Sequence, residues 1–251
     1  MRENIVAGNW KMNLNAQEAN ELTKILVNST QNLGNTPKVI LCTPNVFIPQ
    51  TVSQTQNSTI KVGGQNCFRF DKGAYTGETS ASMLKSVGAE YVIIGHSERR
   101  EYFNESNTQL LGKIKQAQSN NLKVILCCGE PLQERSSGSH IHFVTNQLEE
   151  LFDQLNKEEI EKLIVAYEPI WAIGTGETAS PEQAQEMHAV IRSLLAKYLG
   201  EGGASEISIL YGGSVKGNNA KEIFSNPDID GGLVGGASLN ANDFLAIINA
   251  F

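Results

Sequence analysis

The most informative stretch of this chain is Val165-Ala166-Tyr167-Glu168-Pro169-Ile170-Trp171-Ala172-Ile173-Gly174-Thr175-Gly176. The apolar run from Leu163 to Tyr167 predicts a short buried strand. Glu168 places a carboxylate at the carboxyl end of that strand, and Pro169 ends the strand because proline has no backbone N–H to donate to a sheet. The stretch therefore predicts a strand that delivers one acidic side chain to the edge of a sheet.

The loop after this strand is apolar, although a solvated connection is usually polar. It contains Trp171 and two isoleucines, and it is bounded by Pro169 and Pro181. Two interpretations stay open. The loop is either a flap that closes over a bound molecule or a hydrophobic segment packed permanently on a neighbour.

Similar short runs, rich in β-branched residues, recur along the whole chain. Together with the first, they lie at Ile5 to Ala7, Val39 to Cys42, Ile60 to Gly63, Tyr91 to Ile94, Val124 to Cys127, Leu163 to Tyr167, Ile207 to Tyr211 and Gly232 to Val234. Eight such runs are the number that a (β/α)8 barrel requires, with eight parallel strands inside an outer ring of helices. We therefore expect an α/β fold of this class.

Helical patterns lie between the expected strands. One apolar helix face is formed by Ala184, Met187, Ile191, Leu194, Leu195 and Tyr198. Ser180-Pro181-Glu182-Gln183 starts this helix with a capping residue, a proline at the first helical position and a capping-box glutamine. Further apolar stripes are Val144, Leu148, Leu151, Phe152 and Leu155, and Leu110, Ile114 and Ala117.

The domain organisation is expected to be simple. Nothing in the 251 residues reads as a Pro/Ser-rich linker or a low-complexity tract, so we expect residues 1–251 to form a single barrel domain. The rival fold is a doubly wound open sheet. That fold would need fewer strands and a glycine fingerprint after the first one, which Gly8-Asn9-Trp10-Lys11 does not match.

Composition narrows the function class. Hydrophobic residues make up 40% of the chain, charged residues 19%, and the net charge is −7, which argues against a nucleic-acid or anionic-membrane surface. The apolar runs are too short to span a membrane, and the N-terminus has no signal-peptide pattern. The cysteines Cys42, Cys67, Cys127 and Cys128 lack metal-ligand spacing and are interpreted as reduced thiols, which favours the cytoplasm.

In a (β/α)8 barrel, the loops after the strands share one face, and that face carries the chemistry. The residues that directly follow the expected strands are Asn9 and Lys11; His96, Ser97 and Glu98; Gly129 and Glu130; Glu168; Gly212, Gly213 and Ser214; and Gly235 and Gly236. This set contains a candidate base, a candidate electrophile, a fixed cation and a glycine-rich cradle for an anion.

Glu168 can abstract a proton if apolar cover raises its pKa. The alternative for Glu168 is a structural ion pair. His96 follows the turn residue Gly95, and Ser97 can cap the helix that follows. The imidazole would then lie near a helix N-terminus, whose dipole keeps it neutral and able to donate a hydrogen bond. The alternative is a histidine that only caps the turn.

Lys11 follows Asn9 in the first loop. A surface lysine is the ordinary interpretation, but the neighbouring Trp10 and Met12 argue against an exposed tail. The glycine pairs Gly212-Gly213 and Gly235-Gly236 follow the last two strands, where barrels commonly hold phosphate with backbone N–H groups. Glycine pairs also make tight turns, so each pair alone is weak evidence.

Together these residues predict proton transfer next to a carbonyl group on a small phosphorylated substrate. No cluster has metal-ligand spacing, and no Walker or dinucleotide fingerprint is present. We therefore expect no metal and no cofactor.

The chain resembles the triosephosphate isomerase family over essentially its whole length. The motifs that carry the resemblance are Gly8-Asn9-Trp10-Lys11-Met12-Asn13, Ile94-Gly95-His96-Ser97-Glu98-Arg99-Arg100, Ala166 to Gly176, Tyr211-Gly212-Gly213-Ser214 and Gly232 to Leu239. Any one of these could arise by chance, but all of them in this order are highly specific. The resemblance implies a TIM barrel and the interconversion of dihydroxyacetone phosphate and glyceraldehyde 3-phosphate.

The resemblance also implies roles for single residues. Glu168 would shuttle the proton, His96 would polarise the carbonyl, and Lys11 with Asn9 would contact the substrate and the enediolate. Trp10 is carried over as a further substrate-binding position, and the phosphate would be held by Gly174, Ser214, Gly235 and Gly236. Ser97, Glu98 and Cys127 would support the site. The segment from Pro169 to Ala179 would be a lid that excludes water.

Members of the family are typically homodimers, and the resemblance implies the same assembly here. The loop from Phe68 to Glu78, with Tyr75 and Thr76, would reach the partner's site near Asn9 and Lys11. Aromatic residues on such a surface loop are expected where a partner subunit covers them. The alternative is that the loop packs on itself.

Two positions depart from the family pattern. Glu177 stands where many members carry a lysine, which places a negative charge near the lid. Cys128 stands where many have an aliphatic residue.

Two further functions stay open. One is a phosphate-binding barrel that acts on a larger sugar phosphate, against which the short, crowded lid argues. The other is an inactive barrel kept for binding or adhesion, against which the presence of Glu168, His96 and Lys11 argues.

Overall fold

The structure is a computed structural model that describes residues 2–31, 37–173 and 178–251. The predictions that concern Gly174 and Glu177 lie outside these residues. Eight strands close into one barrel in sequence order, and every neighbouring pair is parallel, including β1 with β8. The strands are β1 Ile5–Asn9, β2 Lys38–Thr43, β3 Lys61–Gly64, β4 Tyr91–Ile94, β5 Lys123–Cys128, β6 Leu163–Tyr167, β7 Ile209–Tyr211 and β8 Gly231–Val234.

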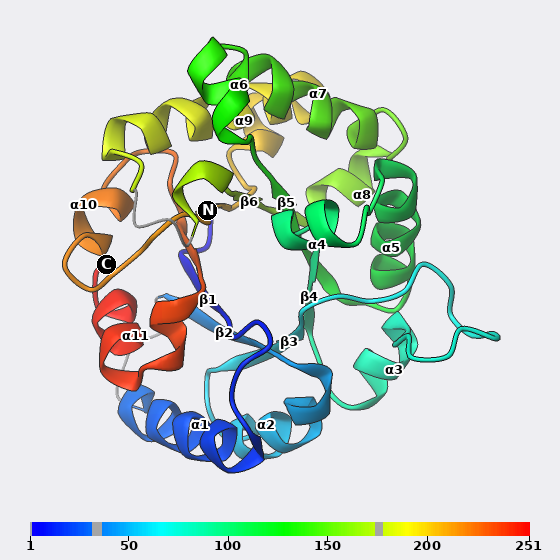
Figure 1. The fold of residues 1–251 in the computed structure, drawn as a ribbon, viewed down its shortest axis with the longest axis vertical. Helices are drawn as coiled ribbons and strands as arrows, with labels where there is room; N and C mark the ends of the chain where they lie inside the picture. Colours follow the sequence, from blue (N-terminus) through cyan, green and yellow to red (C-terminus); the bar gives the residue numbers. More distant parts are fainter. Residues whose placement is uncertain (1, 32–36, 174–177) are drawn as a thin grey trace.

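Helices surround this barrel, as the view along it shows (Figure 1). They are α1 Ala16–Thr30, α2 Ile48–Thr55, α3 Ala81–Ser86, α4 Ser97–Tyr102, α5 Asn107–Ser119, α6 Leu132–Ser137, α7 His140–Phe152, α8 Lys157–Glu161, α9 Pro181–Ala204, α10 Ala220–Phe224 and α11 Ala241–Ile248, with short 3₁₀ turns η1 Asn45–Phe47, η2 Ile170–Ala172 and η3 Gly236–Leu239. The predicted fold class, a (β/α)8 barrel with eight parallel strands and an outer ring of helices, is confirmed.

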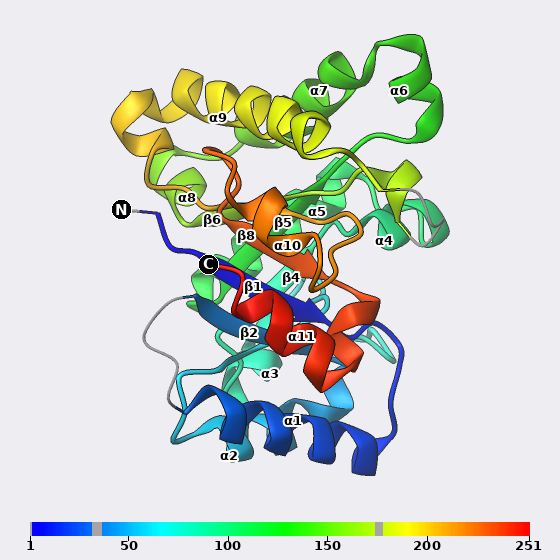
Figure 2. The same cartoon turned by 90° about the vertical axis from the view of Figure 1, so that its left-hand side faces the viewer.

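The predicted strands differ from the observed ones only at their ends. β1 continues to Asn9, so this residue lies on the strand itself and not on the following loop. β7 starts at Ile209, two residues after the predicted start at Ile207. A side view places the N-terminus at one end of the barrel and α4 and α6 at the other, beyond the carboxyl ends of the strands (Figure 2).

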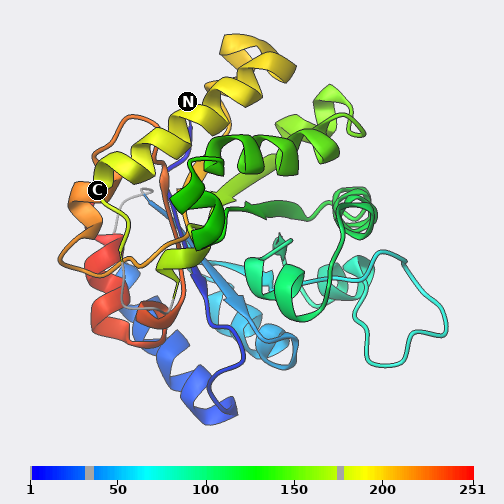
Figure 3. The ribbon, with the colours of Figure 1, turned by 45° about the horizontal axis from the view of Figure 1, so that its top comes forward.

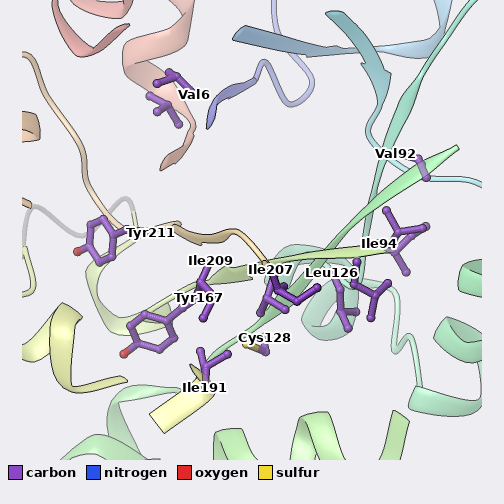
Figure 4. Packing of buried hydrophobic residues seen from close by; sticks show 14 of the residues in the cluster. Val6, Val92, Ile94, Leu126, Cys128, Tyr167, Ile191, Ile207, Ile209 and Tyr211 are labelled. Atoms are coloured by element: carbon purple, nitrogen blue, oxygen red, sulfur yellow. The ribbon is translucent and has the colours of Figure 1, made fainter. Parts of the chain in front are cut away.

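Side chains alternate along each strand between two apolar layers. One layer fills the barrel interior and contains Ile5, Ala7, Ile40, Cys42, Tyr91, Ile93, Ile125, Cys127, Ile164, Ala166, Leu210 and Leu233. The other lies between strands and helices, where Val92, Ile94, Leu126, Cys128, Tyr167, Ile209 and Tyr211 face outward and Ile191 of α9 packs with them (Figure 4). Because Cys127 and Cys128 are consecutive, they face opposite layers.

The start of α9 follows the local signals in the sequence. The Ser180 hydroxyl accepts a hydrogen bond from the Gln183 backbone N–H at 3.2 Å, and the Gln183 side chain accepts one from the Ser180 N–H at 2.9 Å. Pro181 is the first helical residue. The predicted helix start is therefore confirmed. Gly200, with a φ of 76°, interrupts the helical backbone near the end of this element.

In the described part of the chain, the helices lack the length or the apolar character needed to cross a membrane.

His188 of α9 is a fully buried titratable group behind the carboxyl rim. Its ring lies between those of Tyr167 and Tyr211, with centroid distances of 5.9 and 6.4 Å. Its Nδ1 is 3.1 Å from the Asp228 carbonyl oxygen, which fixes the hydrogen on Nδ1. Burial lowers the pKa of His188 to about 4, so the folded protein holds this ring neutral.

This buried ring predicts a loss of stability in acid. The unfolded chain binds a proton at this residue below about pH 6.5, whereas the folded chain does not until about pH 4. As the pH falls through that window, the free energy of unfolding should therefore drop by roughly 3 kcal/mol from this group alone. Urea unfolding of His188→Gln should show a pH dependence flatter by that amount. His142→Gln, at an exposed position on α7, should keep the wild-type pH dependence. Parallel curves for wild type and His188→Gln would contradict the assignment.

Candidate active site

A cavity of about 660 Å³ opens at the carboxyl rim of the barrel. Its walls come from the ends of β1, β4, β6, β7 and β8 and from the residues that follow them. Among the residues predicted from the sequence, those that line it are Asn9, Lys11, His96, Glu168, Gly212, Gly213, Ser214, Gly235 and Gly236. Residues far apart in the chain therefore share one hollow.

Glu168 is held by two donors at the end of β6. Its Oε1 lies 2.9 Å from His96 Nε2, and its Oε2 accepts a hydrogen bond of 2.9 Å from the Ser97 backbone N–H. The side chain is only 2% exposed. Both carboxylate oxygens thus contact the residues that begin α4.

These contacts and burial act on the Glu168 pKa in opposite directions. Burial raises the pKa, but the electrostatic interaction with His96, the hydrogen bond to His96 and the Ser97 N–H together lower it below its ordinary value. The raised pKa was predicted for a closed flap, and residues 174–177 of that flap lie outside the described residues, so this prediction stays open. Glu168 is a carboxylate here, as a base must be before it accepts a proton.

His96 is the N-cap of α4, and its Nδ1 accepts a hydrogen bond of 3.2 Å from the Glu98 backbone N–H. The predicted cap, Ser97, is instead the first helical residue. Burial lowers the pKa of His96, whereas the Glu168 carboxylate raises it, and the net direction is upward. The N–H that points at Nδ1 favours the neutral ring with its hydrogen on Nε2. The sequence predicted that the helix dipole keeps His96 neutral, and the Glu168 carboxylate opposes this effect.

Lys11 is held at its backbone and at its ammonium group. Its N–H donates to Asn9 Oδ1 at 3.1 Å, and its Nζ lies 2.6 Å from Glu98 Oε1. Glu98 therefore connects Lys11 with the helix that His96 caps. The charge run from Glu98 to Arg100 is not merely solvated, since Arg100 donates to the carbonyl oxygens of Gly95 and Cys127 at 2.8 and 3.0 Å.

Cys127 lies in the barrel interior behind Glu168. Burial and the Glu168 charge hold the pKa of its thiol well above its ordinary value. An uncharged thiol therefore neighbours the carboxylate and adds no second negative charge.

The first half of the apolar loop packs on Glu130. The Glu130 Oε1 accepts hydrogen bonds from the Trp171 Nε1–H at 2.8 Å and the Tyr167 hydroxyl at 2.9 Å. Its backbone oxygen accepts the Ile170 N–H at 3.1 Å. Burial raises the pKa of Glu130 above its ordinary value. The choice between a flap and a fixed loop also involves residues 174–177, which lie outside the described residues.

Trp10 does not line this cavity. Its side chain is fully buried in the layer between strands and helices. We assign Trp10 to core packing, which leaves only its backbone next to the site. Its sequence neighbours Asn9 and Lys11 carry the side chains that reach the cavity.

Tyr75 and Thr76 lie far from this arrangement of side chains, on the loop after β3. Tyr75 stacks on Phe70 with ring centroids 5.3 Å apart, and Phe68 packs on both rings. Phe70 and Tyr75 each remain 42% exposed. The loop therefore packs partly on itself and still presents aromatic surface.

The sequence interpretation missed several residues of the cavity wall. They are Val215, Lys216, Gly217, Asn218, Leu233, Ala237 and Asp243. Lys216 lies two residues after Ser214, so extending the seventh loop would have found it. Asp243 belongs to the first turn of α11 and carried no signal in the sequence.

Comparisons with known proteins agree with these features. A family model described as Triosephosphate isomerase matches residues 4–251. A protein named triosephosphate isomerase from Phocaeicola vulgatus is 52% identical over 255 residues, and those of Cytophaga hutchinsonii and Flavobacterium johnsoniae are each 50% identical. In each case the whole of both chains is covered.

The backbone of Glu168 leaves no room for a side chain at Gly129. A Cβ at Gly129 would lie 1.8 Å from the Glu168 carbonyl oxygen. Gly129→Ala should therefore displace the end of β6 by an ångström or more and lower kcat by about 100-fold. Gly202→Ala, where a Cβ would meet nothing within 4 Å, is the matched control and should retain wild-type kcat. Equal turnover in both variants would show that the Glu168 backbone position is not critical.

Proposed function

This chain belongs to the triosephosphate isomerase family, and on that basis we propose that it interconverts dihydroxyacetone phosphate and D-glyceraldehyde 3-phosphate. The observation that carries the proposal is the meeting of Glu168, His96 and Lys11 at one cavity. These groups supply a base, a hydrogen-bond donor and a cation. The reaction moves a proton between two adjacent carbons through an enediolate, and it serves glycolysis and gluconeogenesis.

Glu168 must change partners before it can act. Its two oxygens accept from His96 Nε2 and the Ser97 N–H, and these contacts stabilise the charged form, so a carbon-bound proton must compete with them. A substrate carbonyl oxygen at His96 Nε2 takes over the first of these hydrogen bonds. The carboxylate then loses its hydrogen bond with His96, one of the contacts that lower its pKa, while burial continues to raise the pKa. Substrate binding thereby makes Glu168 a stronger base.

His96 then polarises the carbonyl through Nε2–H. The Glu98 N–H at Nδ1 keeps the proton on the opposite nitrogen. Lys11 places its positive charge where the enediolate oxygens develop negative charge. Its pair with Glu98, at 2.6 Å, holds the ammonium group beside α4.

The phosphate is assigned to the glycine-rich wall of the cavity. Gly212 and Gly213 follow β7, and Gly235 and Gly236 follow β8. Backbone N–H groups with no side chain in front of them can approach phosphate oxygens closely. A Cβ at Gly235 would lie 3.4 Å from Lys11 Cε, so this wall is next to the catalytic cation. We also assign Ser214 to the phosphate site, together with Gly174, which is assigned by family resemblance alone.

A coupled assay with glyceraldehyde 3-phosphate tests this function. We expect turnover by the wild type without added metal or nucleotide. Glu168→Asp should lower kcat by about 100-fold, because the carboxylate retracts by roughly 1 Å. Lys11→Ala should also reduce turnover strongly, since it removes the fixed charge. Near-wild-type turnover of Glu168→Ala would show that Glu168 is not the base, and turnover of only larger sugar phosphates would replace the proposed substrate.

We also infer that the chain acts as a homodimer in the cytoplasm. The loop between β3 and α3 projects from the barrel (Figure 3). Large exposed apolar side chains follow each of the first four strands: Met12, Val46, Phe70, Tyr75, Tyr102 and Phe103. Because β1 to β4 are neighbours in the barrel, these side chains share one sector of the rim, which favours a covered surface. The free, buried cysteines fit a reducing compartment.

Shortening the loop of residues 68–78 should yield a monomer with at least about 10-fold lower kcat, because Thr76 would no longer support the partner's Lys11. Sedimentation velocity and the coupled assay measure the two effects. Leu132→Ser, which removes an exposed apolar side chain on α6, should leave the dimer intact. A monomer with full activity at nanomolar dilution would exclude this role of the loop.

A further inference from the structure

The backbone of Lys11 has a conformation that a lysine rarely adopts. Its φ is 52°, in the left-handed region that favours glycine. A residue in this region persists only where surrounding contacts hold it. Asn9 provides one contact through its side-chain oxygen, which accepts the Lys11 N–H at 3.1 Å. A second contact lies at the carbonyl end of the residue.

Gln65 provides that contact. It follows directly after β3, and its Nε2 donates to the Lys11 carbonyl oxygen at 2.9 Å and to the Cys42 carbonyl oxygen at 3.0 Å. The Cys42 oxygen also accepts the Trp10 N–H at 3.1 Å. The side-chain amide of Gln65, which follows β3, therefore donates one hydrogen to the loop after β1 and the other to β2.

We propose that Gln65 is a positioning residue for Lys11, which its side-chain amide holds in the left-handed turn so that the ammonium group reaches the cavity. Three contacts then define the lysine: Asn9 at its N–H, Gln65 at its carbonyl and Glu98 at its ammonium. This inference rests on the proposed function, because that function makes Lys11 the cation of the reaction.

The positions of the three contacts explain why Gln65 matters for Lys11. Asn9 is the last residue of β1, two positions before Lys11, so its contact ties Lys11 to its own strand and not to the strands beside it. Glu98 contacts only the tip of a long, flexible side chain. Gln65 is the described contact that ties the Lys11 backbone to neighbouring strands. Without it, the turn can relax out of the left-handed region and carry the ammonium group away.

Replacement of Gln65 by leucine keeps the size of the side chain but removes both N–H donors. We expect Gln65→Leu to lower kcat/KM by about 10- to 100-fold, as for a catalytic group misplaced by about 1 Å. Gln118→Leu is the matched control. Gln118 is also partly buried and donates to a backbone carbonyl, that of Glu159 at 2.7 Å, but it lies on α5. This control should retain wild-type kcat/KM.

A double-mutant cycle with Lys11→Gly separates positioning from a general structural role. Glycine adopts a positive φ without strain and carries no ammonium group. In the Lys11→Gly background, Gln65→Leu should cause no further loss in the slow residual turnover. A further loss of 10-fold or more in that background would overturn the proposal.

Two further results complete the test. If Gln65→Leu fails to fold, Gln65→Ala is measured in the same cycle, with the folded fraction determined by sedimentation and circular dichroism. Wild-type kcat/KM in either folded variant overturns the proposal. Absence of triose phosphate turnover in the wild type would instead contradict the proposed function, so the two failures are distinguishable.

Discussion

The parallel direction of the eight strands is the constraint on which the site depends. Because the barrel closes β1 on β8, the carboxyl ends of all strands meet at one rim. Strand interiors supply the apolar layers, so polar side chains can gather only where the strands end. Glu168 directly follows one strand, His96 follows another, and Asn9 is the last residue of a third. The cavity between them is a consequence of closure, not of any single loop.

Within this frame, competition for one carboxylate sets the chemistry. Glu168 is bound by the ring of His96 and the N–H of Ser97, and these partners account for its lowered pKa. The burial of Glu168 is equally important, since burial raises its pKa. A ligand that takes the His96 hydrogen bond changes the balance between the two effects. The contact with His96 thus keeps Glu168 ionised, and a ligand that replaces this contact makes Glu168 a stronger base.

The sequence predicted the barrel well because short apolar runs and helix caps are local signals, as at Ser180. It also identified Glu168 and His96, since residues after strands must share a face. It could not predict their mutual contact, which depends on the backbone geometry that places the Ser97 N–H beside β6. For the same reason it could not predict that His96 and the Ser97 N–H lower the pKa of Glu168 in this arrangement. Gln65 was missed although it directly follows a strand, because a lone glutamine has no chemical signature, and its role depends on the strained φ of Lys11.

The most direct test of the account is a crystal structure with a two-carbon phosphate ester that carries a carboxylate, which mimics the planar enediolate. We predict that His96 Nε2 and Lys11 Nζ contact the carboxylate of the ligand, while its phosphate lies against Gly235 and Gly236. Glu168 should have left the Ser97 N–H and lie within about 3 Å of the ligand carbons. A ligand bound away from this cavity, or a Glu168 that keeps both contacts seen here beside the bound ligand, would contradict the account.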